Sequence, residues 1–379
     1  MMSFENFVEY VRSTVSRYLP PEFEKVAVRT TEVNKNNNLK LTGLIITAPN
    51  SNMSPTIYLN HWYQKYAHED FDLDECVREV AESYLHSLFG EEKKFDISQV
   101  MNYENAHDKI IPRLVSSENN DAFLNEIPHR IMDGLAVVYY LPVSDLDEKG
   151  CSASIRIHNG IMKEWGVTED ELYAASVANL MTNVEAKFQS MREVLLETYF
   201  NIGEEIDERW AAEYLPPEDA GMYVLTNREK FFGAAMLLNH NVMDEIVDRI
   251  GEFYILPSSV HETIFIKKDV APPLEILVGM VNDVNMTEVD VEEKLSDRVF
   301  LYDAKTKEIY RADHEAEHRK NIAETSVGSE ESARTTPPPR HTCGEEGKVA
   351  HLVPEWHEAD KMMTKRRSDV NASFLQRGY

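Results

Sequence analysis

The string His314-Glu-Ala-Glu-His318 has the residue types and the spacing of a zinc site. On a helix, an H-E-x-x-H match places both imidazoles on one face to hold the metal, with the glutamate as general base. Such a site also needs a rigid cavity and a third ligand. Here the flanks are polar, and the chain that follows is rich in Ser, Thr and Pro. We interpret His314, Glu315 and His318 as a coincidental match in a solvated stretch and predict no metal; a zinc-dependent hydrolase is the alternative.

A second candidate lies between two predicted strands, at Ser258, Ser259, His261 and Glu262. Hydroxyl, imidazole and carboxylate groups are the components of nucleophilic catalysis. Neighbours on an extended strand point to opposite faces, however, so His261 and Glu262 do not easily form a relay. A Pro-Ser-Ser turn is the simpler interpretation. A serine-type hydrolase near Ser258 and His261 stays as a second alternative.

The remaining motifs are less specific. His341, Cys343, His351 and His357 crowd the C-terminal segment without zinc-finger spacing. Asn60-His-Trp-Tyr63 is an aromatic cluster that could stack on a ligand ring, although packing is the more common role. The sequence contains no Gly-rich phosphate loop, no G-x-S-x-G elbow and no kinase motif set. We therefore predict no cofactor.

The formal charge of −27 is concentrated in the first 311 residues. Residues 312–379 contain ten Lys/Arg and twelve Asp/Glu, so residues 1–311 carry −25. A body this acidic repels phosphate backbones, because nucleic-acid affinity comes mainly from Lys and Arg. Direct nucleic-acid binding by the body is disfavoured, and a protein with a basic surface is the expected partner.

The compartment is predicted to be the cytoplasm. The three cysteines are far apart and form no Cys-x-x-Cys pair, which is typical of a reducing environment. The N-terminal residues are acidic and amphipathic, so we predict no signal peptide. No stretch approaches the roughly 20 apolar residues that cross a bilayer, so no membrane contact is expected.

Hydrophobic spacing predicts an α+β fold with paired antiparallel strands and flanking helices in two lobes. The first lobe covers residues 1–198, an acidic connector 199–218, the second lobe 219–311, and a disordered tail 312–379. In the first lobe we expect helices at 4–18, 72–88 and from a capping box at 168 through 195, and strands at 25–33, 39–48, 56–59, 135–143 and 152–158. In the second we expect strands at 222–226, 253–256, 262–267, 299–302 and 308–310, and helices at 229–238, 242–250 and 274–284.

Several strings resemble a known bacterial family. They are Lys40-Leu-Thr-Gly-Leu44, Pro55-Thr-Ile-Tyr-Leu-Asn60, Leu135-Ala-Val-Val-Tyr-Tyr140, Tyr223-Val-Leu-Thr-Asn227, Leu256-Pro-Ser-Ser-Val-His-Glu262 and Leu295-Ser-Asp297. In this order they resemble the uncharacterised domain-of-unknown-function family numbered five-six-eight-eight, over about residues 4–310. The segment Trp165-Gly-Val-Thr-Glu-Asp-Glu-Leu172 more weakly resembles family fourteen-forty-four. Neither resemblance implies an activity, a cofactor or site residues; it implies a bacterial, cytoplasmic origin.

Taken together, these features favour a non-enzymatic interaction or regulatory protein that binds a partner protein or a small ligand. The acidic body predicts complexes that weaken as salt rises. The two hydrolase hypotheses remain as alternatives to this interpretation.

Overall fold

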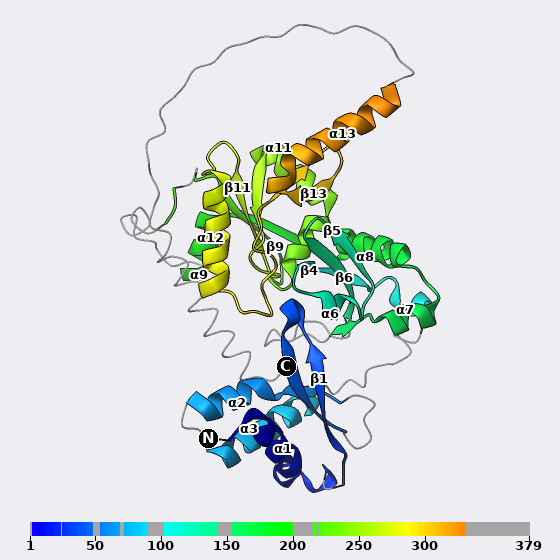
Figure 1. The fold of residues 1–379 in the computed structure, drawn as a ribbon, viewed down its shortest axis with the longest axis vertical. Coiled ribbons are helices and arrows are strands. Elements are labelled where there is room, and N and C mark those ends of the chain that lie inside the picture. The colour runs from blue at the N-terminus through cyan, green and yellow to red at the C-terminus, as the bar shows by residue number, and fades with distance from the viewer. Residues whose placement is uncertain are drawn as a thin grey trace.

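The computed structural model describes residues 2–23, 25–47, 54–68, 72–89, 102–142, 154–199, 215–217 and 220–330. Most of the predicted acidic connector lies outside these residues, as do Cys151, the His341–His357 group and the predicted tail beyond residue 330. Every strand pair is antiparallel, and helices flank the sheets, so the predicted α+β class is confirmed (Figure 1). No helix among the described residues is long and apolar enough to cross a membrane.

The N-terminal residues form a unit with its own apolar core. Helix α1 (Phe4–Thr14) begins at Ser3, whose hydroxyl accepts a hydrogen bond from the Asn6 amide. Helices α2 (Leu59–His68) and α3 (Leu73–Phe89) pack against the antiparallel sheet β1-β2-β3. The buried core of this unit contains no residue from beyond Tyr84. Its members are Phe7, Val11, Val15, Phe23, Leu44, Ile46, Ile57, Leu59, Trp62, Cys76, Val77, Val80, Ala81 and Tyr84.

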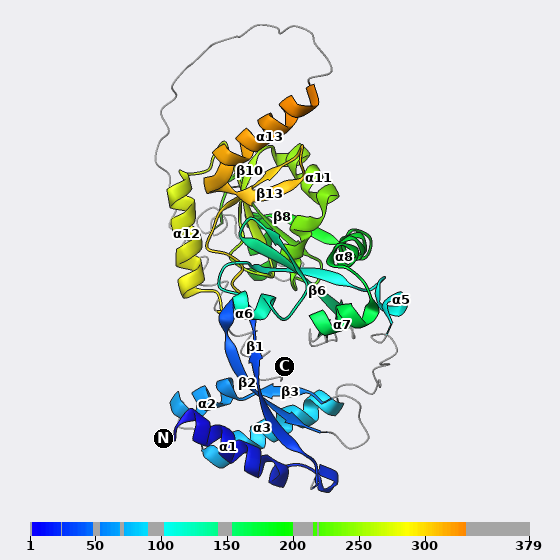
Figure 2. The same ribbon diagram turned by 45° about the vertical axis from the view of Figure 1, so that its right-hand side comes forward.

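A two-stranded arm extends from this unit. Strands β1 (Val28–Asn34) and β2 (Lys40–Ile46) pair along seven residues, whereas β3 (Thr56–Tyr58) covers β2 only at residues 43–45. The outer half of the β1–β2 hairpin is therefore a free ribbon. Its tip, residues 35–39, reaches helix α6 (Asp121–Leu124) and the end of strand β4 (Ile111–Ser116), as Figure 2 shows.

Residues 102–330 contain two further sheets with a shared core. The smaller sheet has the order β4-β6-β5, with β6 at Leu135–Pro142 and β5 at His129–Met132, and β7 (Ser154–Arg156) pairs with the end of β6. The larger has the order β13-β12-β10-β11-β9-β8. Its strands are β8 (Ala186–Ser190), β9 (Met222–Asn227), β10 (Phe253–Leu256), β11 (Thr263–Lys267), β12 (Phe300–Asp303) and β13 (Glu308–Arg311). The largest apolar cluster takes residues from both sheets, such as Leu114, Val137, Leu225 and Phe265.

Helices close these sheets. They are α5 (Tyr103–Ala106), α7 (Asn159–Trp165), α8 (Glu169–Asn183), α9 (Met191–Tyr199), α11 (His240–Ile250) and α12 (Leu274–Thr287). Helix α8 begins with the predicted capping box, in which Thr168 and Glu171 bond reciprocally. Gly251 ends α11 with φ +76°, as expected for a helix C-terminal glycine.

Two helix predictions were wrong. The apolar spacing from residue 168 to 195 predicted one helix, but α8 ends at Asn183 and the next residues form β8, which pairs with β9. Phe188, assigned to the helical face, instead stacks on Tyr223 and meets Phe265 edge-on. Residues 229–238 form a turn and a 3₁₀ helix, Gly233–Leu238, rather than an α-helix. Tertiary pairing overrode the local pattern in both places.

The chain stays ordered beyond Arg311, where the sequence predicted disorder. A 3₁₀ turn at Ala312–His314 leads into helix α13 (Glu315–Glu330), and Ala312 is buried. The predicted disorder therefore does not hold for residues 312–322, which are helical although most of their side chains are exposed. The lobe boundaries at 198 and 219 stay a prediction. The β8–β9 pair spans the connector within one sheet.

Candidate functional site

The serine and histidine candidates lie together but do not form a relay. Ser259 is buried, and its Oγ accepts a hydrogen bond from the His261 amide at 3.0 Å. The His261 ring turns elsewhere: Nδ1 accepts from the Phe232 amide at 3.1 Å, and Nε2 lies 3.4 Å from Glu293. With both ring nitrogens directed away from the serine hydroxyls, His261 is not placed to act as their general base. Glu262 directly precedes strand β11 (Thr263–Lys267).

His261 belongs to an aromatic and cationic cluster that the sequence did not reveal. The Phe231 ring stacks on His261 with centroids 5.3 Å apart, and the Phe232 ring is 5.2 Å away. The buried guanidinium of Arg113 lies 3.6 Å from the centre of the Phe232 ring and 4.0 Å from that of Tyr140. Such cation–π contacts stabilise a buried arginine. The cluster joins β4 and β6 of the smaller sheet to the larger one.

Backbone strain accompanies this cluster. Lys230 and Phe232 have φ of +54° and +52°, which non-glycine residues rarely adopt. The Asn227 side chain holds the turn by bonding both the amide and the carbonyl of Phe231. A Cβ on Gly233 would lie 2.6 Å from the His261 carbonyl oxygen, so only glycine fits there. Strain of this kind persists where surrounding contacts over-determine it, and it marks the turn as a candidate position of function.

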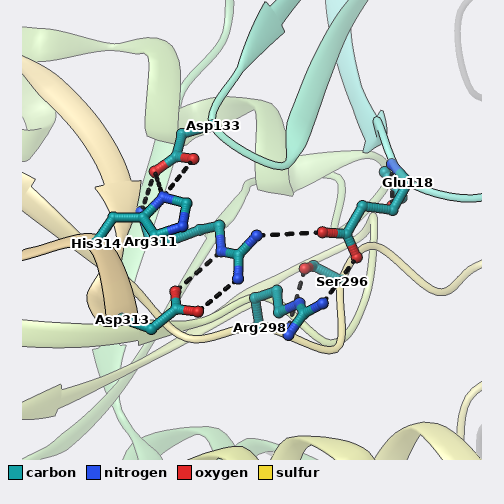
Figure 3. Close-up of polar contacts among 8 residues, drawn as sticks. Glu118, Asp133, Ser296, Arg298, Arg311, Asp313 and His314 are labelled. Atoms are coloured by element: carbon teal, nitrogen blue, oxygen red, sulfur yellow. Dashed lines mark hydrogen bonds and ion pairs between the residues drawn. The ribbon is translucent and has the colours of Figure 1, made fainter.

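The zinc-like string is folded, but its imidazoles do not converge. His314 precedes α13 and points to Asp133 of the β5–β6 turn, with Nδ1 3.0 Å from Oδ1 (Figure 3). His318 lies on α13, stacks on Tyr310 with centroids 3.8 Å apart, and faces Asp303 at 3.3 Å. Glu315 bonds Lys268 at 2.9 Å. Each member of the string therefore has a different structural partner. No group of three or more metal-ligating side chains occurs within the described ranges.

A network of arginines and carboxylates surrounds the β5–β6 turn. Arg311 forks onto Asp313, and its Nη1 lies 3.4 Å from Glu118 Oε1. Arg298 approaches the other oxygen of the same carboxylate, with Nη2 3.4 Å from Oε2. Two guanidinium groups thus converge on one carboxylate, as Figure 3 shows. The hydrogen bond from Arg311 holds the pKa of Asp313 below its ordinary value.

The arm tip makes several polar contacts with parts of the chain that are distant in sequence. Asn36 and Asn120 are both buried, and the side-chain Nδ2 of Asn120 donates to Asn36 Oδ1 at 2.8 Å. The Asn37 amide in turn donates to Asn120 Oδ1 at 2.8 Å. Both tip side chains also donate to carbonyl oxygens of the segment 291–294, over 2.7–3.0 Å. We name residues 34–38 with these bonds the asparagine plug.

Left-handed backbone makes the plug possible. Asn37 and Asn38 have φ of +59° and +55°, a conformation that asparagine tolerates better than most residues. Lys35 adds an ion pair to Glu292 at 2.9 Å, and Asn34 bonds Glu126 at 3.0 Å. The plug thus inserts between the segment 116–126 and the segment 291–294 through hydrogen bonds and an ion pair.

Comparison with known proteins gives one match. A model described as a family of unknown function (DUF5688) matches residues 4–304. The chain belongs to this family. No curated protein and no solved structure matches the chain. The match covers the N-terminal unit, the plug and most of both remaining sheets, and ends within the β12–β13 hairpin.

For this DUF5688 member, the sequence indicated only part of these sites. The run Asn34-Lys-Asn-Asn-Asn38 is polar, and its asparagines are residue types that tolerate the left-handed backbone seen at Asn37 and Asn38. Its acceptors lie 83 and more residues away, so no local pattern could identify them. The clustering of Arg298 and Arg311 on Glu118 likewise joins residues 180 and 193 positions apart.

Proposed function

We propose that this protein is a non-enzymatic interaction or regulatory protein, in which the asparagine plug sets the position of the N-terminal unit. The observation that carries the proposal is the nature of the contact between two separately packed cores. Within the described part of the chain, the buried N-terminal core spans residues 7–84 and the main core spans residues 106–309. Polar contacts between packed units resemble transient interfaces, for which relative motion is the default expectation.

Charge supports a basic protein as the partner. Residues 1–311 carry −25, and their long-range field attracts cationic surfaces and repels nucleic acid. Such complexes form quickly at low salt and weaken as salt screens the charges. The three widely spaced cysteines, which form no Cys-x-x-Cys pair, support a reducing, cytoplasmic setting for this interaction.

The test is capture with the full chain at two salt concentrations. The immobilised protein is exposed to cell lysate at about 50 mM and about 500 mM salt. These concentrations lie on either side of the physiological ionic strength, at which the Debye length is about 8 Å. A captured basic protein is then purified and its binding to the full chain measured directly. We expect binding that is lost at high salt and reduced by Asn120→Ala. Capture insensitive to salt, or no partner at all, would contradict the proposal.

The two hydrolase alternatives have less support and separate tests. Stoichiometric zinc that disappears on truncation after Arg311 would favour the peptidase; the partner assignments of His314 and His318 argue against it. Labelling of Ser258 or Ser259 by a fluorophosphonate probe would favour the serine hydrolase. The His261 ring geometry argues against that alternative.

A further inference from the structure

We propose that Arg298 and Arg311 form a binding site for a small-molecule carboxylate, and that Glu118 occupies this site from within the chain. The two guanidinium groups approach the two oxygens of the Glu118 carboxylate, one nitrogen to each oxygen. A free carboxylate presents the same two oxygens. The site therefore already displays the chemistry of its ligand.

Glu118 is an imperfect occupant. Both of its contacts are 3.4 Å long, whereas charge-assisted N–H···O bonds are usually about 2.7–2.9 Å. Nε of Arg298 is enclosed and has no hydrogen-bond partner within the described part of the chain. Leaving an enclosed donor without an acceptor is unfavourable, because the donor has lost its hydrogen bonds to water. A ligand carboxylate set against the Nε and Nη2 edge of Arg298 would form the paired bonds that Glu118 does not.

The two arginines are fixed in place from behind. The Arg298 amide donates to Ser296 Oγ at 3.1 Å, and the buried Asn285 side chain bonds the Ser296 carbonyl at 2.9 Å. Arg311 donates its amide to Asp133 at 2.8 Å, and its side chain forks onto Asp313. The backbone of both arginines and the guanidinium of Arg311 are thus held before a ligand binds, which reduces the freedom lost on binding.

Glu118 itself can leave the site. Its side chain is 41% exposed, and that of Arg298 is 42% exposed, so a small solute can reach the contact. Glu118 sits in a turn in which Asn119 has φ +59°, outside any strand. Exchange of one carboxylate for another keeps an anionic group between the two arginines, while the tethered Glu118 carboxylate turns to solvent. No new unpaired arginine is created when the ligand replaces Glu118.

The experiment uses propionate, which matches the end of a glutamate side chain, on the full chain with labelled arginine nitrogens. At constant ionic strength, the Nε–H signal of Arg298 is followed by NMR in the wild type and in Glu118→Gln. Removing the tethered competitor should tighten propionate binding by about tenfold or more, because a tethered group acts at high effective concentration. Arg298→Gln combined with Glu118→Gln should abolish saturable binding, as followed on the labelled arginine signals of the chain.

The control is Glu185→Gln, which removes a carboxylate from an exposed pair with Arg228. It should leave propionate binding at the wild-type level. The proposal would be overturned if the chemical-shift changes of the Arg298 Nε–H signal never saturate with propionate in Glu118→Gln. Equal propionate affinity in Glu118→Gln and Glu185→Gln would also overturn it. Saturable binding of inorganic phosphate tighter than that of propionate would overturn the carboxylate assignment. None of these outcomes depends on a protein partner, so this site and the proposed function can fail separately.

Discussion

Removal of the Asn120 side chain should release the arm while both cores stay folded. Asn120 is fully buried and makes three bonds: it donates to Asn36 and to the Ser116 carbonyl, and it accepts from the Asn37 amide. In Asn120→Ala all three are lost, and the buried Asn36 oxygen and Asn37 amide lose their partner. The apolar cores contain none of these three asparagines, so we expect the packing of both cores to be unchanged.

The magnitude follows from these bonds. A net contribution of about 0.5–1.5 kcal/mol for each hydrogen bond gives about 1.5–4.5 kcal/mol in all. Two of these bonds, to Asn36 and from the Asn37 amide, join Asn120 to the arm and therefore contribute to docking. Their loss also leaves buried polar groups unpaired, which adds to the free-energy cost. We expect docking to weaken by about 3 kcal/mol, which is more than a hundredfold in the equilibrium between docked and released arm.

Hydrogen exchange at peptide resolution is the assay. Amides of residues 34–39 should exchange faster in Asn120→Ala by the same factor, while amides of α3 and β6 keep wild-type rates. The matched control is Asn282→Ala, which removes a side chain that bonds only Val278 within α12. Unchanged exchange at residues 34–39, or equal acceleration throughout the chain, would refute the reasoning.

Three further predictions test local packing and titration. Gly233→Ala should cost about 3 kcal/mol or more of unfolding free energy, because the new Cβ meets backbone atoms at 2.6 Å. Gly279→Ala, at an exposed position of α12, should instead gain about 1 kcal/mol, and urea unfolding compares the two variants. Cys76 is buried, and burial raises its pKa to about 11, so peptide-level mass spectrometry should find it unreactive to alkylation until the chain unfolds. Burial lowers the pKa of His158 and His240 below 6.5, so the fold favours their neutral forms. The stability that these neutral imidazoles contribute is present above the ordinary pKa and is lost as pH falls through the folded-state pKa values. The urea concentration at the unfolding midpoint should therefore be lower at about pH 5 than at about pH 7.5. The difference should be smaller in the variant with both histidines changed to glutamine.

Elements held together by local signals could be predicted from sequence. The α8 capping box, the Gly251 helix end and the hairpin β12–β13 each depend on residues within a few positions, and all are confirmed. The segment 186–190 shows the limit. Its apolar spacing fits a helix, but pairing with β9, far along the chain, makes it a strand. Local periodicity cannot weigh a partner that it does not contain.

The same limit explains the candidate site. The sequence identified His261, Ser259 and the zinc-like string by residue type alone, and such chemistry depends on the direction of each ring. His318 stacks on Tyr310, and His314 turns to Asp133, a residue 181 positions earlier. Order beyond Arg311 was missed because few apolar residues support it. Ion pairs and one aromatic stack, rather than a core, hold the start of α13.

The turn at residues 116–120 links the asparagine plug to the proposed carboxylate-binding site. Glu118 faces Arg298 and Arg311, while Asn120, two residues later, holds Asn36 and Asn37. On the opposite side, the segment 291–294 accepts the plug, and Arg298 follows four residues beyond it. A ligand that replaces Glu118 therefore acts on the same turn that anchors the arm. Because hydrogen bonds and an ion pair hold the plug, a change of a few kcal/mol in that turn is comparable with the energy of several of these contacts. With an apolar interface of the same extent, we would expect such a ligand to change the equilibrium between docked and released arm much less.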